Sequence, residues 1–414
     1  MPSFAQRADA YPVLRSHEPC PTTPPPQCKR GLPSARRVLR VVVSKSKLLY
    51  LVTEPWYFAS HRLDHALALQ EAGFEVHVAT RRGARWEELV EAGCVLHEID
   101  IGRGLGSTRS WLREIRALRK VIRRARPDLV HAVALKPVAL ALSLLGKRRR
   151  PALILSVNGL GMSAASGGRR LALIRGVINS VRRLPRVHLL FQTRADQHAV
   201  VGCETVGVVV PGVGVDTGRF RPAARSATPP LTVVFLGRAI RAKGLLDLAA
   251  ACEEEIPGVE VNLYCIVDSA SPGALGSEEL QRLERPPAIS LHPATLDPEG
   301  VLGRAHAAIL PSHAGEGVSK FVLEALASGT PVLLSGESGS GEVIEPGRTG
   351  VVFKAADPAS IRAALLEVAC WSADRWAEAS AACRSAAERE FSLDVILPRI
   401  VELHRAALGN RSSP

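Results

Sequence analysis

Short apolar runs alternate with amphipathic segments along most of the chain. In the first half the runs predict buried strands at 39–53, 74–81, 94–101, 128–134, 152–159 and 187–193. In the second half they predict strands at 231–237, 259–267, 288–293, 307–312, 331–335 and 349–353. The segments between them have helical periodicity, for example 61–72, which Gly73 ends, and 107–126, which Ser107 opens. Strands that are apolar on both faces and alternate with helices predict parallel βαβ units.

A segment rich in Gly and Pro at 206–230 interrupts this rhythm, which then restarts. We therefore expect an α/β fold of two Rossmann-like domains that face each other across a cleft, over 39–205 and 231–390. A C-terminal helix and tail follow over 391–414. Residues 1–38 are Pro-rich and basic without the apolar core of a secretory signal, and we expect a disordered extension there. Ligands of open α/β sheets bind beyond the carboxyl ends of the strands, so we expect the functional residues to lie in the cleft.

Positive charge is concentrated in the first half of the chain. Residues 1–200 contain 34 Lys and Arg against 14 Asp and Glu, a net charge of +20, whereas residues 201–414 contain 19 against 26, a net charge of −7. The cations cluster at 113–126, 147–150 and 169–186. These clusters are either solvated helix faces or a peripheral contact with an anionic membrane, where each cation near the surface contributes ~1 kcal/mol. Nucleic acid is not expected as a partner, because aromatic residues are only 4% and do not interleave with the cations.

The eight cysteines form no CxxC pair or zinc-type spacing, which predicts reduced thiols in a cytoplasmic protein. No apolar run reaches the ~18 residues that a membrane-spanning helix needs. If the basic clusters contact a membrane, we expect the protein at the inner face of that membrane.

Two carboxylates and a helix start form the clearest candidate site. Glu316 ends a Gly-containing loop directly after a predicted strand, and Glu324 lies in the helix that starts near Ser319. Helical side chains lean toward the N-terminus, so Glu324 can point back at the loop. The backbone N–H groups of Gly317, Val318 and Ser319 would form an anion site for a diphosphate, with one acid near a sugar ring and the other on ribose hydroxyls. Two surface carboxylates on a Gly-flanked helix are the alternative.

Two cations follow another predicted strand. The strand ends at Gly237, and Arg238 and Lys243 flank a short loop. Arg as a fork and Lys as a point charge suit a diphosphate, and both would stabilise it as a leaving group in place of a metal. An ordinary basic turn is the alternative. No Asp-x-Asp occurs, so we expect no metal and no cofactor beyond a nucleotide-sugar co-substrate.

Together these segments resemble the GT-B glycosyltransferases of family 4, which are retaining enzymes with nucleotide-sugar donors. The family pattern is a strand, then Gly-Arg-x4-Lys-Gly, then Glu-x7-Glu, and this chain matches it with Gly237, Arg238, Lys243, Gly244, Glu316 and Glu324. The resemblance implies that Arg238 and Lys243 grip the donor diphosphate. It further implies that Glu316 lies near the transferred sugar, that Glu324 holds the ribose, and that the domain at 231–390 binds the donor while the domain at 39–205 binds the acceptor.

The first half is similar to a narrower group of bacterial enzymes that extend polyprenyl-diphosphate-linked saccharides. The similarity lies in 54–81, 127–141, 158–166 and 191–197. The sequence "YFASHR" retains His61 and Arg62 of that group. Lys136 follows the predicted strand at 128–134. The resemblance implies that His61, Arg62 and Lys136 contact the acceptor phosphates or the reacting sugar; a helix-capping histidine and solvated cations are the alternative. His131, inside a predicted strand, is expected to be structural.

The resemblance implies a retaining glycosyltransferase that moves a sugar, most simply from a UDP-sugar, to a lipid-linked saccharide in cell-surface glycan synthesis. Its catalytic residues would be Glu316, Arg238, Lys243 and His61, and its last helix, near 392–408, would cross back over the domain junction. Two other functions stay open. A GT-B UDP-sugar epimerase would use the same donor grip without an acceptor, and a non-catalytic partner of another transferase would bind the nucleotide sugar only.

Overall fold

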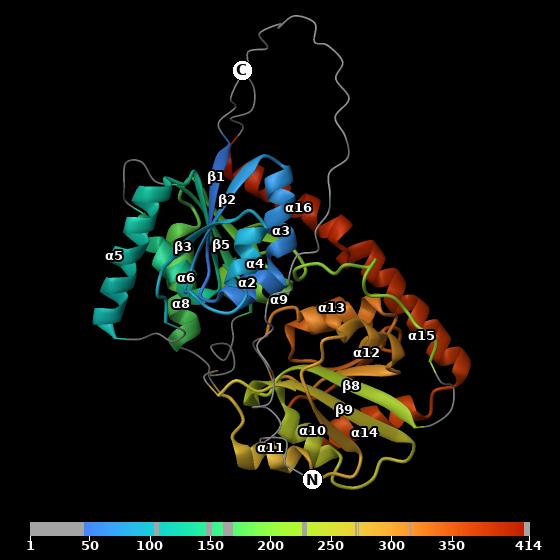
Figure 1. Cartoon of the computed structure of the whole chain (residues 1–414). Coiled ribbons are helices and arrows are strands. Elements are labelled where there is room, and N and C mark those ends of the chain that lie inside the picture. The colour runs from blue at the N-terminus through green and yellow to red at the C-terminus, as the bar shows by residue number, and fades with distance from the viewer. Residues whose placement is uncertain are drawn as a thin grey trace, which may run out of the picture.

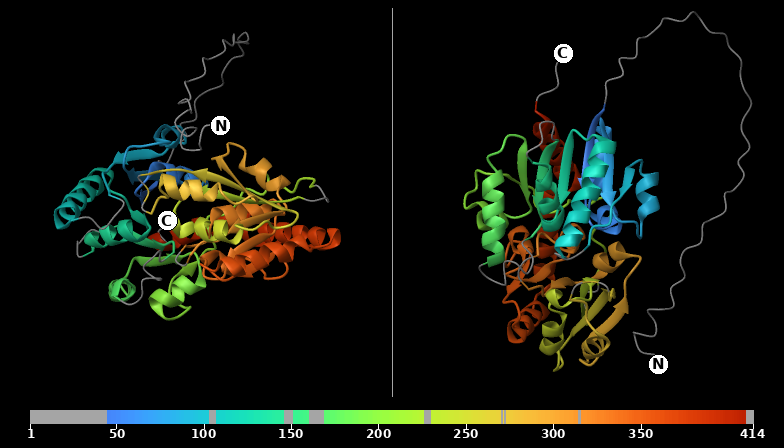
Figure 2. Two further views of the ribbon diagram at one scale, coloured as in Figure 1. Left: turned by 90° about the horizontal axis from the view of Figure 1, so that it is seen from below. Right: turned by 90° about the vertical axis from the view of Figure 1, so that its left-hand side faces the viewer.

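The computed structural model describes residues 45–102, 107–145, 151–159, 169–225, 230–269, 271, 273–313 and 316–409. The extension expected at 1–38 and the basic cluster at 147–150 lie outside the described residues. Two lobes are visible in Figures 1 and 2, one for each half of the chain. Within the described residues, no helix is long and apolar enough to cross a membrane.

The first lobe is built on a parallel sheet in the order β3-β2-β1-β4-β5-β6-β7. Its strands are β1 (Ser46–Leu51), β2 (Phe74–Thr80), β3 (Val95–Glu98), β4 (Leu129–Val133), β5 (Ala152–Val157), β6 (Val187–Phe191) and β7 (Val208–Val209). Leu48 on β1 lies between Val76 of β2 and Leu129 of β4. The strand order therefore reverses beside β1, and the carboxyl ends of β1 and β4 mark the point where such sheets bind ligands.

Alternate residues of β1 point to opposite faces of this sheet, and both faces are covered. Leu49 and Leu51 belong to the hydrophobic core shared with the helices of one face, which are α5 (Thr108–Ala125), α6 (Leu135–Ala141), α8 (Arg169–Val181) and α9 (Arg194–Val201). Leu48 and Tyr50 belong to the core of the other face, under α2 (Pro55–His61), α3 (Leu63–Glu71), α4 (Trp86–Glu91) and α16 (Leu393–Leu408).

The helix predicted at 61–72 is confirmed over Leu63–Glu71, but it begins two residues later than expected. The chain forms two helices, α2 and α3, and Arg62 separates them with φ −134° and ψ 0°. Arg62 and His65 are both buried, with relative exposures of 1% and 0%. The consequence is that His61 ends one helix and Arg62 turns into the core.

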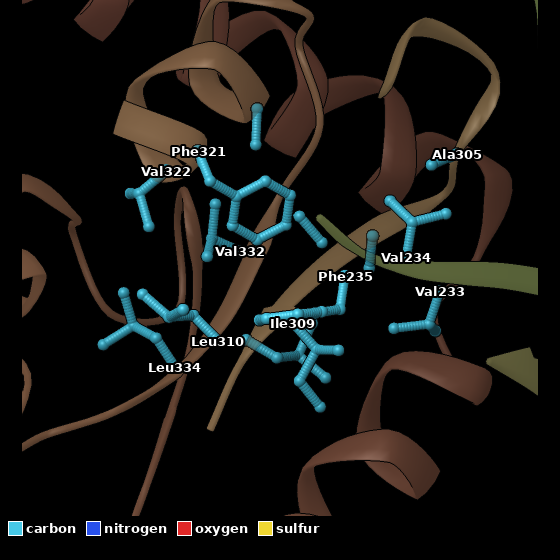
Figure 3. Close-up of a cluster of buried hydrophobic side chains, with 14 of the residues drawn as sticks. Val233, Val234, Phe235, Ala305, Ile309, Leu310, Phe321, Val322, Val332 and Leu334 are labelled. Atoms are coloured by element: carbon cyan, nitrogen blue, oxygen red, sulfur yellow. The ribbon is translucent and has the colours of Figure 1, made fainter. Parts of the chain in front are cut away.

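The second lobe contains a parallel sheet in the order β10-β9-β8-β11-β12-β13. Its strands are β8 (Leu231–Arg238), β9 (Val259–Ile266), β10 (Ile289–Pro293), β11 (Ala307–Leu310), β12 (Val332–Ser335) and β13 (Gly350–Phe353). Around it lie α10 (Leu245–Ala251), α11 (Ser277–Leu283), α12 (Pro298–Arg304), α13 (Lys320–Ala327) and α14 (Pro358–Ala369). Figure 3 shows how Phe321 of α13 packs over Phe235 of β8, with ring centroids 5.9 Å apart. This apolar contact fixes α13 on the sheet, and its N-terminus faces the other lobe.

The C-terminal helices connect the lobes. Helix α15 (Ala373–Ala386) belongs to the second lobe, whereas α16 contributes Ile396, Ile400 and Leu403 to the core of the first. The crossing is tied to the connecting segment, because the backbone N–H of Leu393 donates to the carbonyl of Val215 at 3.0 Å. This is the crossing that the family resemblance implies for the last helix.

His131 lies under this crossing helix. It is fully buried on β4, and its Nδ1 is 3.1 Å from Nε2 of His404 on α16. Burial, together with the neighbouring His404, lowers its pKa well below the ordinary value. These contacts agree with the structural role expected for His131.

Candidate active site

A cavity of about 680 Å³ lies between the two lobes, at the carboxyl ends of both sheets. From the first lobe it is lined by Trp56, Tyr57, Ser60, His61, Arg85, Asn158 and Gln192. From the second lobe it is lined by residues in or directly beyond the carboxyl ends of β8 and β9, by residues of the loops after β10 and β11, and by the start of α13. Eight of the ten predicted site residues line this one cavity: His61, Arg238, Lys243, Glu316, Gly317, Val318, Ser319 and Glu324.

The cationic wall is formed by Arg238 and Lys243. Arg238 is the last residue of β8, and with the described residues its guanidinium makes no hydrogen bond or ion pair, so its donors are available to a ligand. Lys243 ends the short 3-10 helix η3 (Arg241–Lys243), and its Nζ is ion-paired with Glu316 Oε1. Both partners are partly shielded from water, with side-chain exposures of 13% and 27%. A bound phosphate would therefore compete with Glu316 for Lys243.

Gly244, the last residue of the Gly-Arg-x4-Lys-Gly pattern, has two physical reasons to be glycine. Its φ is +67°, which L-residues with a side chain rarely adopt. A Cβ atom there would also lie 2.0 Å from the carbonyl oxygen of Pro311 on the segment that leads to Glu316. Gly244 thus allows the loop that carries Lys243 to approach the loop that carries Glu316.

The anion site predicted at the start of α13 needs a correction. The backbone N–H of Ser319 is already used, because it donates to Ser340 Oγ at 2.9 Å. The N–H groups of Gly317 and Val318 have no hydrogen-bond partner among the described residues. Two of the three predicted donors therefore remain for a ligand. The N–H group of Ser319 instead attaches the start of α13 to Ser340.

Glu324 lies one turn into α13 and faces the cavity. Its Oε1 is 3.5 Å from Nζ of Lys320. Burial raises the pKa of Glu324 above the ordinary value, and the neighbouring Lys320 and Arg219 only partly oppose this effect. The carboxylate is therefore held in a position that favours a ligand with hydroxyl donors, because these would replace lost hydration.

His61 reaches the cavity from the opposite wall. Its ring stacks on Tyr57 at 4.5 Å, and its Nδ1 is 2.6 Å from Ser60 Oγ. Burial, with the charges of Lys320 and Arg62 nearby, lowers the pKa of His61 to about 3. The imidazole is therefore neutral at physiological pH and can exchange a hydrogen bond with a sugar hydroxyl or a phosphate oxygen without adding charge.

Asn158 and Gln192 are site residues that sequence reasoning missed. Each follows a buried strand of the first sheet, and both line the cavity. Asn158 accepts from Ser156 Oγ at 2.7 Å and donates to the Tyr57 hydroxyl at 3.3 Å, so it supports the ring on which His61 stacks. Their position at the carboxyl ends of β5 and β6 is the signal that could have identified them.

Arg62 and Lys136 are not at the cavity. Arg62 was expected to face the cleft, but it is only 1% exposed and points at His65, with Nη1 3.3 Å from His65 Nδ1. Lys136 donates to Glu114 Oε1 at 2.9 Å, and the two side chains are 9% and 2% exposed. The geometry therefore supports a packing role for both residues in this structure, in place of the acceptor contact predicted for them.

Two family models match the chain, one for each lobe. A model described as Glycosyl transferase 4-like matches residues 47–184, and one described as Glycosyl transferases group 1 matches residues 230–370. Glycogen synthase of Mycobacterium tuberculosis is 29% identical over 208 residues, which are 49% of this chain and 49% of that protein. The chain thus spans about half the length of this curated relative.

Solved structures cover much more of the chain. A glycosyltransferase from Rickettsia africae aligns with a TM-score of 0.71 at 17% identity, over 89% of this chain and 100% of the other. Anabaena HepE, solved in complex with UDP and glucose, aligns with a TM-score of 0.69 at 16% identity, over 87% of this chain and 100% of the other. At these identities the similarity establishes a shared fold of two Rossmann-like domains.

Proposed function

The chain belongs to the GT-B glycosyltransferases of the family-4-like type, and from this membership we propose that it transfers a sugar from a nucleotide-diphosphate sugar to a lipid-linked saccharide with retention of configuration. The observation that carries the proposal is the convergence of Arg238, Lys243, Glu316 and Glu324 on one interdomain cavity. UDP is the proposed nucleotide; Anabaena HepE, which shares the fold, binds UDP and glucose.

Donor binding would rearrange the ion pair in the cavity. The diphosphate would lie between Arg238, Lys243 and the N–H groups of Gly317 and Val318. Lys243 would then leave Glu316 for a phosphate oxygen, and Glu316 would become free to accept hydrogen bonds from the sugar. Hydrogen bonds to charged groups contribute about 1.5–3 kcal/mol each, so loss of one cation should weaken the donor complex about tenfold or more.

The chemistry proposed is a front-face displacement without a metal. Among the described lining residues the carboxylates are Glu316 and Glu324, both on the donor wall, and the opposite wall presents the neutral His61. The acceptor hydroxyl would attack the anomeric carbon on the face from which the nucleotide leaves. The bond from that carbon to the phosphate oxygen breaks, and the hydroxyl proton passes to a leaving phosphate oxygen. Arg238 and Lys243 stabilise the charge that develops there.

The basic face of helix α5 is an argument for a lipid-linked acceptor. The exposed positions of α5 include Arg109, Arg113, Arg116, Lys120 and Arg123, whereas its acid, Glu114, is buried. This face of the first lobe lies at the edge of the molecule in Figure 1 and would be attracted to the anionic inner face of the cytoplasmic membrane. Such a contact would bring the first lobe to the polyprenyl-linked acceptor.

The test is a donor screen with purified protein. A panel of nucleotide sugars is incubated in the presence of EDTA, with and without a polyprenyl-diphosphate-linked saccharide, and both free nucleotide and glycan products are measured. We expect acceptor-dependent release of UDP that is lost in Arg238→Ala and Glu324→Ala. An isomerised nucleotide sugar formed without acceptor would identify an epimerase, and binding without turnover of any donor would leave a binding partner.

A further inference from the structure

Glu342 joins the two lobes outside the cavity. It belongs to the 3-10 helix η4 (Gly339–Val343) of the second lobe. Its Oε2 accepts the backbone N–H of Arg194 at 2.7 Å, and its Oε1 accepts that of Ala195 at 2.7 Å. Both donors are in the first turn of α9 in the other lobe, so one carboxylate caps a helix across the domain junction.

This cap completes the N-terminus of α9. Thr193, the N-cap residue, accepts the N–H of Asp196 on its Oγ1 at 3.0 Å. The first two N–H groups of the helix therefore depend on Glu342, and the third depends on Thr193. A carboxylate at a helix N-terminus also interacts favourably with the helix dipole. If the lobes separated, Arg194 and Ala195 would lose their partner and their amides would face water.

The same short helix η4 holds the donor loop. The backbone N–H of Gly339 donates to the carbonyl of Glu316 at 3.0 Å, and Ser340 Oγ accepts the N–H of Ser319 at 2.9 Å. The approach is close: a Cβ atom on Gly339 would lie 2.3 Å from the carbonyl oxygen of Glu316. Both ends of the loop 316–319 are therefore attached to the element that carries Glu342.

The donor loop itself also touches the first lobe. A Cβ atom on Gly317 would lie 2.3 Å from Gln192 Oε1 and 3.2 Å from the carbonyl carbon of Asn158. Gln192 directly precedes Thr193, so the loop contact and the Glu342 cap lie side by side along one junction. Closure of the lobes, the cap on α9 and the position of the donor loop are thus linked through a continuous set of contacts.

We propose that Glu342 is a positioning residue that couples domain closure to the arrangement of the donor loop. In the closed molecule, Glu342 holds η4 against α9, and η4 holds Glu316 and Ser319 at the cavity. When the lobes open, η4 loses this support and the loop relaxes, which permits the donor to enter and the nucleotide to leave. The inference rests on the proposed glycosyl transfer for its catalytic part, whereas the cap across the domain junction can be measured without turnover.

The test compares Glu342→Ala and Glu342→Gln with the matched control Glu337→Gln. Glu337 lies five residues earlier and accepts the backbone N–H of Ala355 at 3.0 Å within its own lobe. Amide hydrogen exchange at Arg194 and Ala195 should become about fivefold faster in Glu342→Ala, the change expected for loss of a typical cap, and stay unchanged in the control. Glu342→Gln should be intermediate, because its amide keeps one acceptor oxygen.

Catalysis separates a positioning role from a merely structural one. At a temperature where the variant stays folded, we expect Glu342→Ala to raise the KM for the nucleotide sugar and to increase donor hydrolysis relative to transfer. Its effect should be less than additive with that of Ser340→Ala, because both act through η4.

Three outcomes decide the inference. Unchanged amide exchange at Arg194 and Ala195 in Glu342→Ala would overturn the proposal that Glu342 caps α9 and holds η4 against it. Faster exchange with unchanged donor KM and hydrolysis would overturn the positioning role and leave an ordinary cap. If the wild-type protein turned over no nucleotide sugar, the proposed function would fail, and the exchange measurement would still decide whether Glu342 caps α9 across the domain junction.

Discussion

Gly244→Ala tests the geometry that brings the two cavity loops together. The new Cβ would adopt a φ of +67° and would lie 2.0 Å from the oxygen and 2.9 Å from the carbon of the Pro311 carbonyl. The left-handed backbone costs about 1–2 kcal/mol for a residue with a Cβ. Displacement of the backbone of Pro311 adds about 1–3 kcal/mol, the range for overpacked sites. We expect the free energy of unfolding to fall by about 2–5 kcal/mol.

Gly202→Ala is the matched control for this variant. Gly202 has a φ of +72°, close to that of Gly244, but a Cβ there would meet nothing within 4 Å. It should therefore lose only the about 1–2 kcal/mol of backbone strain. The difference between the two variants in urea denaturation isolates the overlap with Pro311.

Gly244→Ala should also impair catalysis, because it would displace Lys243, the residue before it. A misplacement of about 1 Å can lower kcat/KM by about 10²-fold. Gly202→Ala, far from the cavity loops in sequence, should retain wild-type kcat/KM. A Gly244→Ala variant that lost no more stability than Gly202→Ala, or that kept the wild-type kcat/KM for the donor, would show that Gly244 does not have this role.

Other predictions follow from the charged groups of the cavity. Because burial raises the pKa of Glu324, the native carboxyl holds its proton more tightly than the unfolded chain does; Glu324→Gln should raise the melting temperature at pH 8, and the gain should disappear as the pH falls through the raised pKa toward 4.5. A constant gain at all pH values would contradict this. His61, with a pKa of about 3, should cause no step in kcat/KM between pH 5 and 8, and a step present in the wild type but absent in His61→Asn would show otherwise. Arg238→Lys keeps the charge but loses the fork, so calorimetric titration should show UDP binding about tenfold weaker, and equal affinity would exclude a bidentate contact.

Much of this architecture could be predicted from the sequence because it depends on local patterns. Continuous apolar runs predicted both parallel sheets, since strands buried on two faces need apolar residues at every position. Site residues at the carboxyl end of a strand or in the loop after it, such as Arg238 and Glu316, were located well, because the carboxyl ends of parallel strands meet at one edge.

The rest depends on contacts between residues far apart in the chain. Ser319 was expected to offer its N–H to a ligand, but Ser340, 21 residues later, accepts that hydrogen bond. Arg62 was expected at the cleft, but a helix break turns it into the core beside His65. Nothing in the local pattern around Glu342 indicates that it caps a helix 148 residues earlier. Tertiary packing determines the contacts of such residues, and these contacts cannot be predicted from the local periodicity of the sequence.

The most direct measurement of the central claim is a crystal structure of the protein with bound UDP in a buffer that contains EDTA. We expect the diphosphate within hydrogen-bond distance of Arg238, Lys243 and the N–H groups of Gly317 and Val318, with the ribose at Glu324 and the ion pair between Lys243 and Glu316 broken. A nucleotide bound elsewhere, or a diphosphate in the cavity that leaves that ion pair intact and does not touch Arg238, would contradict it.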